Sequence, residues 1–240
     1  MNNRTAPASP ETYARVGGVL YLIIIVAGGF AELFARSRLI VSGDAAATAG
    51  KIMASESLWR SAFAAELVML VCDVVVALIL YVLLRPVDKN LALLAAFFRL
   101  MHVAIYGITG LTNVAVLVLL GGADYLTAFQ PHQLQALAFL CLRMHGEGYD
   151  VALVFFGFHC LFLGYLIFRS GYFPRLLGIL MIVASLSYLA NSFAGILAPR
   201  FQAMLFPGIL LPFFVAEVSL SLWLTVKGVD VAKWQERAGG

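Results

Sequence analysis

Six stretches of this chain are apolar over the length that an α-helix needs to cross a lipid bilayer. A helix that rises about 1.5 Å per residue spans the hydrocarbon core of about 30 Å in about 20 residues. Only 12% of the residues are charged and 62% are hydrophobic, whereas a soluble domain carries about 25% charged residues. The sequence therefore predicts an all-α, polytopic membrane protein with six transmembrane helices in one bundle. The predicted spans are Val16–Phe34, Trp59–Leu84, Leu91–Leu120, Tyr149–Phe168, Leu176–Leu197 and Phe201–Val226.

The chain divides into one membrane domain with a polar tail at each end. Residues 1–15 are polar and contain two prolines, and this composition predicts a flexible cytoplasmic tail. Residues 16–228 hold all six apolar segments, and residues 229–240 form a short polar C-terminal tail. The first apolar segment is long and lacks a small-residue cleavage site, so it is predicted to be an uncleaved first span rather than a signal peptide.

The positions of lysine and arginine predict the orientation of the bundle. Nine of these residues fall on the side that carries both termini and six on the other side, while Arg99 lies within a span. Cytoplasmic loops carry the excess of positive charge in membrane proteins. Both termini are therefore predicted to be cytoplasmic. The residues on that side are Arg4, Arg15, Arg85, Lys89, Arg169, Arg175, Lys227, Lys233 and Arg237.

Two longer connections then face outward, and each predicts a short interfacial helix. In the first, the Asp44 carboxylate can accept the unpaired backbone N–H groups at the start of "AAATAGKIMAS". The second contains "PHQLQALAFLCLRM" at 131–144, which is too short to span a bilayer. This segment is expected to lie on the outer surface or to dip partly into the protein.

Five ionisable residues on four predicted spans lie at a similar depth. Counted from the cytoplasmic end of each helix, their depths are about 14–18 Å, close to the bilayer midplane. Ionisable residues at this depth are costly and usually face the protein interior, so we expect them to contact one another. Arg99 would pair with one of the two carboxylates, and the histidines would donate to either. These midplane residues are Asp73, Arg99, His102, His159 and Glu217.

Three interpretations of the midplane residues stay open at the level of sequence. They can form a polar network that only fixes helix packing, or a ligand-binding site or ion pathway. They can also hold a cofactor: Asp73, His102, His159 and Glu217 have side chains that suit several metals. Bis-histidine ligation of haem by His102 and His159 is a further variant, which requires both imidazoles to face one cavity.

A second polar group lies near the outer ends of the predicted helices. Its residues are typical of solvated helix ends, and the helix dipole stabilises acidic side chains at a helix N-terminus. The functional alternative is an acidic outer vestibule that admits a cation or an amine. The candidates are Glu32, Glu66, Glu147, Asp150 and Asn191.

Other classes of function have little support. The net charge of +3 is modest and the basic residues gather at segment ends, unlike the basic stripe of a nucleic-acid-binding surface. Cys72, Cys141 and Cys160 have no metal-ligand spacing and predict no disulfide framework. The expected partners are therefore the lipid bilayer and a small solute or cation, and the sequence specifies neither a cofactor nor an oligomeric state.

Several stretches resemble those of a known family of membrane proteins. They include "ARVGGVLYLIIIVAGGFAE", "GDAAATAGKIMASESLWR", "ALILYVLLRPVDKNLALLAAFFRL" and "FFGFHCLFLGYLIFRSGYFPRLLGILMIVASLSYL". The chain resembles a bacterial multi-pass family catalogued as domain of unknown function 4386, and the resemblance covers nearly the whole chain. It implies a bacterial inner-membrane location and a single helical domain, and it implies no activity.

Three functions are compatible with these features. The first is binding or transport of a small solute or ion through the midplane residues, as ionisable groups do in transporters. The second is a membrane-embedded enzyme or redox protein that uses metal or haem. The third is a non-catalytic membrane protein that acts in assembly or in a stress response. Transport is the preferred hypothesis, and the site residues are expected to be the midplane group.

Overall fold

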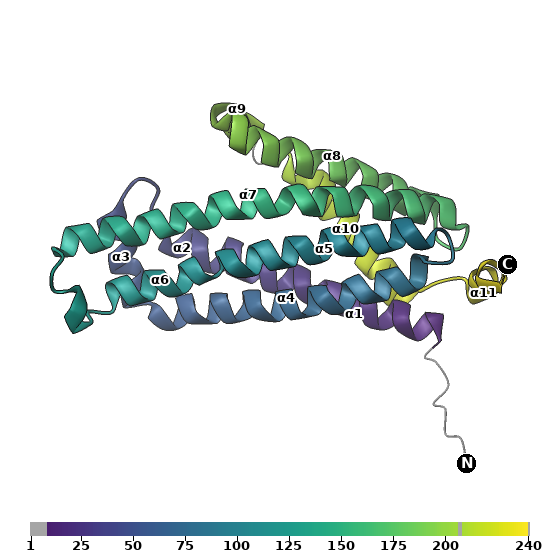
Figure 1. The fold of residues 1–240 in the computed structure, drawn as a ribbon, viewed down its shortest axis with the longest axis horizontal. Coiled ribbons are helices and arrows are strands. Elements are labelled where there is room, and N and C mark those ends of the chain that lie inside the picture. Colours follow the sequence, from purple (N-terminus) through teal and green to yellow (C-terminus); the bar gives the residue numbers. More distant parts are fainter. Residues whose placement is uncertain (1–8, 206–207, 240) are drawn as a thin grey trace, which may run out of the picture.

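The computed structural model describes residues 9–205 and 208–239, and these residues form helices joined by short turns, without a β-strand (Figure 1). The first helix runs without a break through α1, the π-helix η1 and α2. The remaining elements follow in chain order. The bounds are α1 Pro10–Gly29, η1 Phe30–Arg36, α2 Ser37–Leu39, α3 Ala45–Ala54, α4 Glu56–Leu84, α5 Lys89–Thr109, α6 Leu111–Leu120, η2 Asp124–Leu126, α7 Pro131–Ser170, α8 Arg175–Leu197, α9 Pro199–Leu205, α10 Leu210–Val226 and α11 Val231–Gly239.

The helices are long and apolar enough to make this a multi-pass membrane protein. Within the described residues, five helical stretches meet the length and hydropathy of a span, and α10 with α11 makes a sixth if the bent pair counts as one. The two helices of that pair meet at 94°. The predicted all-helical membrane bundle is thus confirmed. The five stretches are Pro10–Leu39, Glu56–Leu84, Lys89–Leu120, Pro131–Ser170 and Arg175–Leu197.

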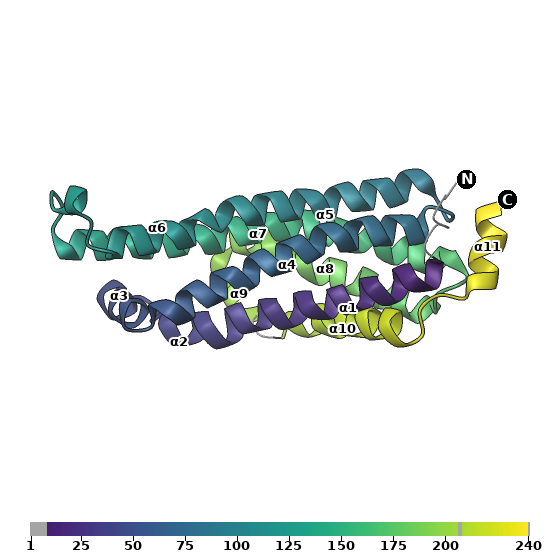
Figure 2. The ribbon, with the colours of Figure 1, turned by 90° about the horizontal axis from the view of Figure 1, so that it is seen from below.

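Six helices form a closed ring in the order of the sequence. Each of α1, α4, α5, α7, α8 and α10 packs against the next, and α10 returns to pack against α1. Short turns make neighbouring helices antiparallel. Asp88 caps α5 by accepting the backbone N–H of Leu91 at 2.9 Å, and Gly171 ends α7 with a φ of +78°, which glycine adopts without strain. Both turns lie at the end of the bundle where α1 begins and α11 ends (Figures 1 and 2).

Two glycines allow α7 and α8 to pack with their backbones nearly in contact. A Cβ atom added to Gly164 would lie 2.8 Å from the carbonyl oxygen of Gly178, and one added to Gly178 would lie 2.7 Å from the carbonyl oxygen of Gly164. Small residues promote such close helix contacts in membranes, where van der Waals packing replaces the hydrophobic driving force. This contact fixes the side of α7 that faces the interior of the ring.

The second outer connection differs from the prediction. Residues 131–144 are not a separate surface segment but the first part of α7, a continuous helix of 40 residues. Gln130 and Gln133 form a reciprocal capping box and Pro131 occupies the first turn. Both features stabilise the N-terminus of the helix. At about 1.5 Å per residue, α7 is about 60 Å long and extends well beyond the bilayer core. The predicted fourth span, Tyr149–Phe168, is only its second half.

The first outer connection agrees with the prediction. The Asp44 carboxylate accepts the backbone N–H of Ala47 at 2.8 Å and starts α3. Thr48 ties the preceding loop to this helix because its hydroxyl accepts the backbone N–H of Val41 at 2.9 Å. A short outer helix is therefore confirmed here.

Three predicted boundaries shift. The helix at the N-terminus begins at Pro10, so only residues 1–8 of the predicted flexible tail remain, and they lie outside the described residues. The predicted sixth span, Phe201–Val226, is divided between α9 and α10, and residues 206–207 also lie outside the described part.

The predicted C-terminal tail contains α11, which crosses the end of the bundle (Figure 2). Trp234 anchors it by donating its indole N–H to the carbonyl of Leu83 at 2.9 Å.

Candidate functional site

The centre of the ring contains a fully buried ion pair between α4 and α5. Arg99 is 0% exposed and Asp73 is 2% exposed. Arg99 donates from Nε to the Asp73 Oδ1 atom at 2.8 Å, and its Nη2 donates to the same oxygen. The predicted contact among midplane residues is thus present, and Asp73 rather than Glu217 is the partner of the guanidinium. This pairing offsets the cost of holding both charges away from water.

His159 completes the coordination of Arg99 from α7. Its Nδ1 lies 2.9 Å from the carbonyl oxygen of Ala95, and because a carbonyl only accepts, Nδ1 carries the proton. Its Nε2 lies 3.0 Å from Nη1 of Arg99, and because the guanidinium only donates, Nε2 accepts. His159 is therefore a neutral imidazole with both nitrogens engaged.

This arrangement bears on the two cofactor hypotheses for the midplane residues. A metal or haem ligand needs a free nitrogen lone pair, and the Nε2 lone pair of His159 accepts from Arg99. Both nitrogens of His159 are engaged, so these contacts give no support to haem ligation by His102 and His159. The ligand atoms of Asp73, His102, His159 and Glu217 also do not gather into a metal-binding group.

Two aromatic rings enclose the guanidinium of Arg99. Its Cζ atom lies 4.7 Å from the ring centroid of Tyr21 on α1 and 5.3 Å from that of Phe156 on α7. A desolvated cation over an aromatic face gains about 2 kcal/mol. Arg99 therefore connects α1, α4, α5 and α7 and contributes to the packing of these helices.

A cavity of about 170 Å³ lies beside this ion pair. Asp73, His102 and Glu217 contribute polar atoms to its wall. His102 donates from Nδ1 to the carbonyl of Ala152 at 3.1 Å, and Glu217 accepts the hydroxyl of Tyr188. The rest of the wall is largely aromatic and aliphatic. It consists of Ile24, Ile25, Gly28, Met69, Tyr149, Leu153, Phe156, Tyr188, Phe213 and Phe214.

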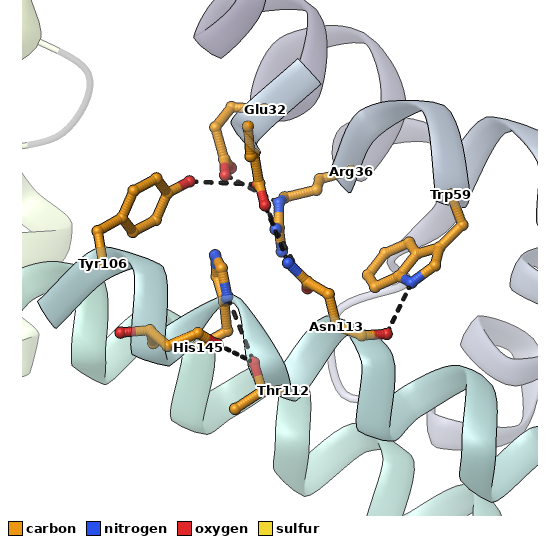
Figure 3. Close-up of polar contacts among 9 residues, drawn as sticks. Glu32, Arg36, Trp59, Tyr106, Thr112, Asn113 and His145 are labelled. Atoms are coloured by element: carbon orange, nitrogen blue, oxygen red, sulfur yellow. Dashed lines mark hydrogen bonds and ion pairs between the residues drawn. The ribbon is translucent and has the colours of Figure 1, made fainter. Parts of the chain in front are cut away.

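A second polar cluster, which we call the outer cluster, lies toward the far end of the bundle. It is centred on the buried carboxylate of Glu66, which receives three hydrogen bonds. Figure 3 shows the three donors, Arg36, Tyr106 and Asn113. Arg36 donates to its Oε1 at 2.5 Å, Tyr106 donates to the same oxygen at 3.2 Å, and Asn113 donates to Oε2 at 3.0 Å. The cluster consists of Glu32, Arg36, Glu66, Tyr106, Asn113 and His145.

The π-helix η1 supplies two members of the outer cluster. Glu32 and Arg36 both lie on this segment and form an ion pair, with 2.8 Å between Arg36 Nε and the Glu32 carboxylate. Trp59 covers Arg36, with its ring centroid 5.5 Å from the guanidinium, and donates its indole N–H to the carbonyl of Asn113 at 3.1 Å. Segments of π-helix are rare and frequently occur at functional sites.

The five predicted vestibule residues do not share one site. Glu32 and Glu66 belong to the outer cluster, whereas Asp150 and the Asn191 carbonyl both accept from the amide of Gln202 at 3.3 Å. Glu147 is exposed. These contacts divide the predicted vestibule residues between separate groups, because His145, Glu147 and Asp150 lie on different sides of α7.

Of the outer cluster, the sequence singled out only Glu32 and Glu66. Arg36, Asn113 and His145 are not among the predicted site residues. The depth count that found the midplane residues contains the missing signal: Asn113 lies 23 residues beyond Asn90, and His145 lies 24 residues before Arg169. At about 1.5 Å per residue, these two polar residues are level with one another on packed helices.

Comparison with known proteins places the chain in a family. The model of the family described as Domain of unknown function (DUF4386) matches residues 16–228. The chain belongs to this family. The match to DUF4386 spans the helix ring together with the central cavity and the outer cluster. It confirms the resemblance that the sequence stretches indicated.

The chain is also similar to a protein from an archaeon. An uncharacterised protein of Archaeoglobus fulgidus is 32% identical over 159 residues, which cover 66% of this chain and 78% of the relative. No solved structure matches the chain.

Proposed function

We propose that this DUF4386 protein binds a small organic cation in the central cavity and moves it across the membrane. The observation that carries the proposal is the Glu217 carboxylate on the cavity wall. Asp73 also lines this cavity, but its charge is already matched by Arg99. The hydroxyl of Tyr188 binds Glu217 without neutralising it. Among the described residues, the Glu217 carboxylate therefore has no cationic partner and is available to a bound cation.

The remaining wall suits a cation that carries alkyl groups. Phe156 and Tyr188 meet edge to face at 5.2 Å, and Tyr188 stacks on Phe213 at 4.3 Å. Aromatic faces attract organic ammonium groups through their quadrupoles. The volume of about 170 Å³ is close to that of cavities of about 150 Å³ that hold a benzene molecule. A small quaternary ammonium or guanidinium ion matches this space.

Flux into proteoliposomes tests the proposal. Vesicles that contain the purified protein are expected to take up radiolabelled choline, tetramethylammonium or guanidinium faster than empty vesicles. Glu217→Gln removes the charge with little change in volume, and we expect it to lower this uptake by about tenfold or more, since charge-assisted contacts contribute about 1.5–3 kcal/mol. Glu147→Gln, which changes an exposed glutamate on α7, is expected to leave uptake unchanged. Uptake equal to that of empty vesicles, or uptake insensitive to Glu217→Gln, would refute the proposal.

We further propose the bacterial inner (cytoplasmic) membrane as the location, with both termini in the cytoplasm. The support is the excess of lysine and arginine at the end of the bundle where α1 begins and α11 lies. Green fluorescent protein fused to the C-terminus is expected to fluoresce, and alkaline phosphatase fused at the same place is expected to be inactive. Active phosphatase at this position would show that the C-terminus lies outside the cytoplasm and that the proposed orientation is incorrect.

A further inference from the structure

The outer cluster brings together three side chains that commonly bind metal ions. Glu32, Glu66 and His145 each offer one ligand atom, and these atoms all lie within 4.8 Å of one another. They come from η1, α4 and α7, which are far apart in the sequence. We propose that Glu32, Glu66 and His145 form a binding site for a divalent metal ion, with zinc as the ion that this ligand set fits best.

The unpartnered nitrogen of His145 is the second observation that points to a ligand. His145 is 4% exposed, and its Nε2 has no hydrogen-bond partner among the described residues. Its Nδ1 faces the Thr112 hydroxyl at 3.4 Å. Figure 3 shows the ring of His145 pointing toward Glu32 and Arg36. A buried lone pair without a partner is costly, and a metal ion at this position would satisfy it.

Both carboxylates keep lone pairs that a metal ion can use. Each carboxylate oxygen accepts two contacts. On Glu66, Oε2 receives one hydrogen bond, from Asn113. On Glu32, Oε1 faces Arg36 at 2.8 Å, and the side chain is 43% exposed. The contacts with Arg36, Asn113 and Tyr106 orient the carboxylates in the way that outer hydrogen bonds orient metal ligands.

The ligand types favour zinc, which binds histidine nitrogen together with carboxylate oxygen. The two carboxylates and Arg36 leave a net charge of −1 before an ion enters. Zinc binds histidine nitrogen and carboxylate oxygen at about 2.0–2.2 Å, which places tetrahedral ligand atoms about 3.4 Å apart. The three ligand atoms lie within 4.8 Å of one another, so they need to approach by at most about 1.4 Å to reach this geometry. The half-exposed Glu32 side chain has the freedom to make that movement.

The ion has a route from outside the bundle. A cavity of about 610 Å³ is lined by Glu32, Arg36 and His145 together with the loop at Ser42 and Gly43. Three protein ligands leave one tetrahedral position open toward this cavity, as in zinc sites that bind water or a substrate. The site is separate from the central cavity, which shares none of these ligands.

Zinc titration of the full-length protein tests the site. The protein, purified in nanodiscs with its affinity tag removed and stripped with a chelator, is titrated with zinc chloride by calorimetry. We expect one equivalent to bind, and we expect both His145→Ala and Glu32→Gln to weaken binding by about tenfold or more. Zinc is also expected to raise the Tm of the wild-type protein and to leave that of His145→Ala unchanged.

Matched controls distinguish this site from surface binding. His132→Ala changes an exposed histidine on the same helix, and Glu147→Gln changes an exposed glutamate; both are expected to bind zinc as the wild type does. Glu32→Gln keeps the test valid if His145→Ala fails to fold, because the Glu32 side chain is half exposed. Absence of a stoichiometric site in the wild type, or unchanged binding in Glu32→Gln and in any folded His145→Ala protein, would overturn the proposal.

Discussion

Arg99→Leu is expected to destabilise the protein by about 3–5 kcal/mol, because it leaves the Asp73 carboxylate buried without its cation. It also removes the N–H group that His159 Nε2 accepts, so a second buried group loses its partner. In thermal unfolding of the detergent-solubilised protein, we expect the Tm to fall by roughly 10 °C. Gel filtration of the same sample reports whether the variant remains monodisperse.

A double variant separates the charge from the packing. Arg99→Leu combined with Asp73→Leu removes both charges, and we expect it to recover most of the lost stability, because replacing both members of a buried pair is often neutral. Arg60→Leu is the matched control, since Arg60 pairs with Glu56 on the exposed surface of α4 and exposed pairs contribute little. Equal Tm values for Arg99→Leu and Arg60→Leu would contradict the role assigned to the buried pair.

Gly164→Ala is expected to destabilise the contact between α7 and α8 by about 1–3 kcal/mol. The new Cβ would lie 2.8 Å from the carbonyl oxygen of Gly178 and 2.9 Å from the backbone nitrogen of Ile182. Backbone atoms of a packed helix do not yield as a flexible side chain does, so α8 must move outward. The measurement is the Tm, together with the fraction of protein that elutes as a single species.

Another glycine of α7 provides the opposite expectation. Gly146→Ala meets no atom within 4 Å, and in a helix alanine is more favourable than glycine by about 1 kcal/mol. We therefore expect Gly146→Ala to raise the Tm slightly and Gly164→Ala to lower it. Gly157→Ala falls between them because its Cβ would meet the movable side chain of Leu189 at 2.8 Å. A Tm for Gly164→Ala at or above that of Gly146→Ala would show that the two helices are not held this closely.

The central site was largely predictable because helix depth follows directly from residue count. Counting from the cytoplasmic ends placed Asp73, Arg99 and His159 at one level, and the structure brings these three into contact. Depth alone does not give the direction in which a side chain points. The choice of Asp73 over Glu217 as partner of Arg99 therefore depended on the rotation of each helix, which only packing sets.

The burial of the outer cluster was not predicted from the sequence. Its members lie near helix ends, where a polar residue is ordinarily solvated, so composition gave no reason to expect burial. Residues 131–144 are too short to span a bilayer, so they were predicted to lie on the outer surface or to dip partly into the protein, and His145 follows directly after them. The continuous helix α7 instead carries His145 alongside α6 and into contact distance of Glu32 and Glu66.

The sequence by itself determined the membrane class, the apolar segments, the short turns and the start of α3 at Asp44. These features are local: each depends on hydrophobic length, on a capping side chain or on a turn residue within a few positions. The tertiary structure decided the closure of the ring between α1 and α10, the partner of Arg99 and the meeting of Glu32, Glu66 and His145. These contacts join residues far apart in the chain, and they depend on how each helix rotates and tilts when glycines and aromatic side chains pack against one another.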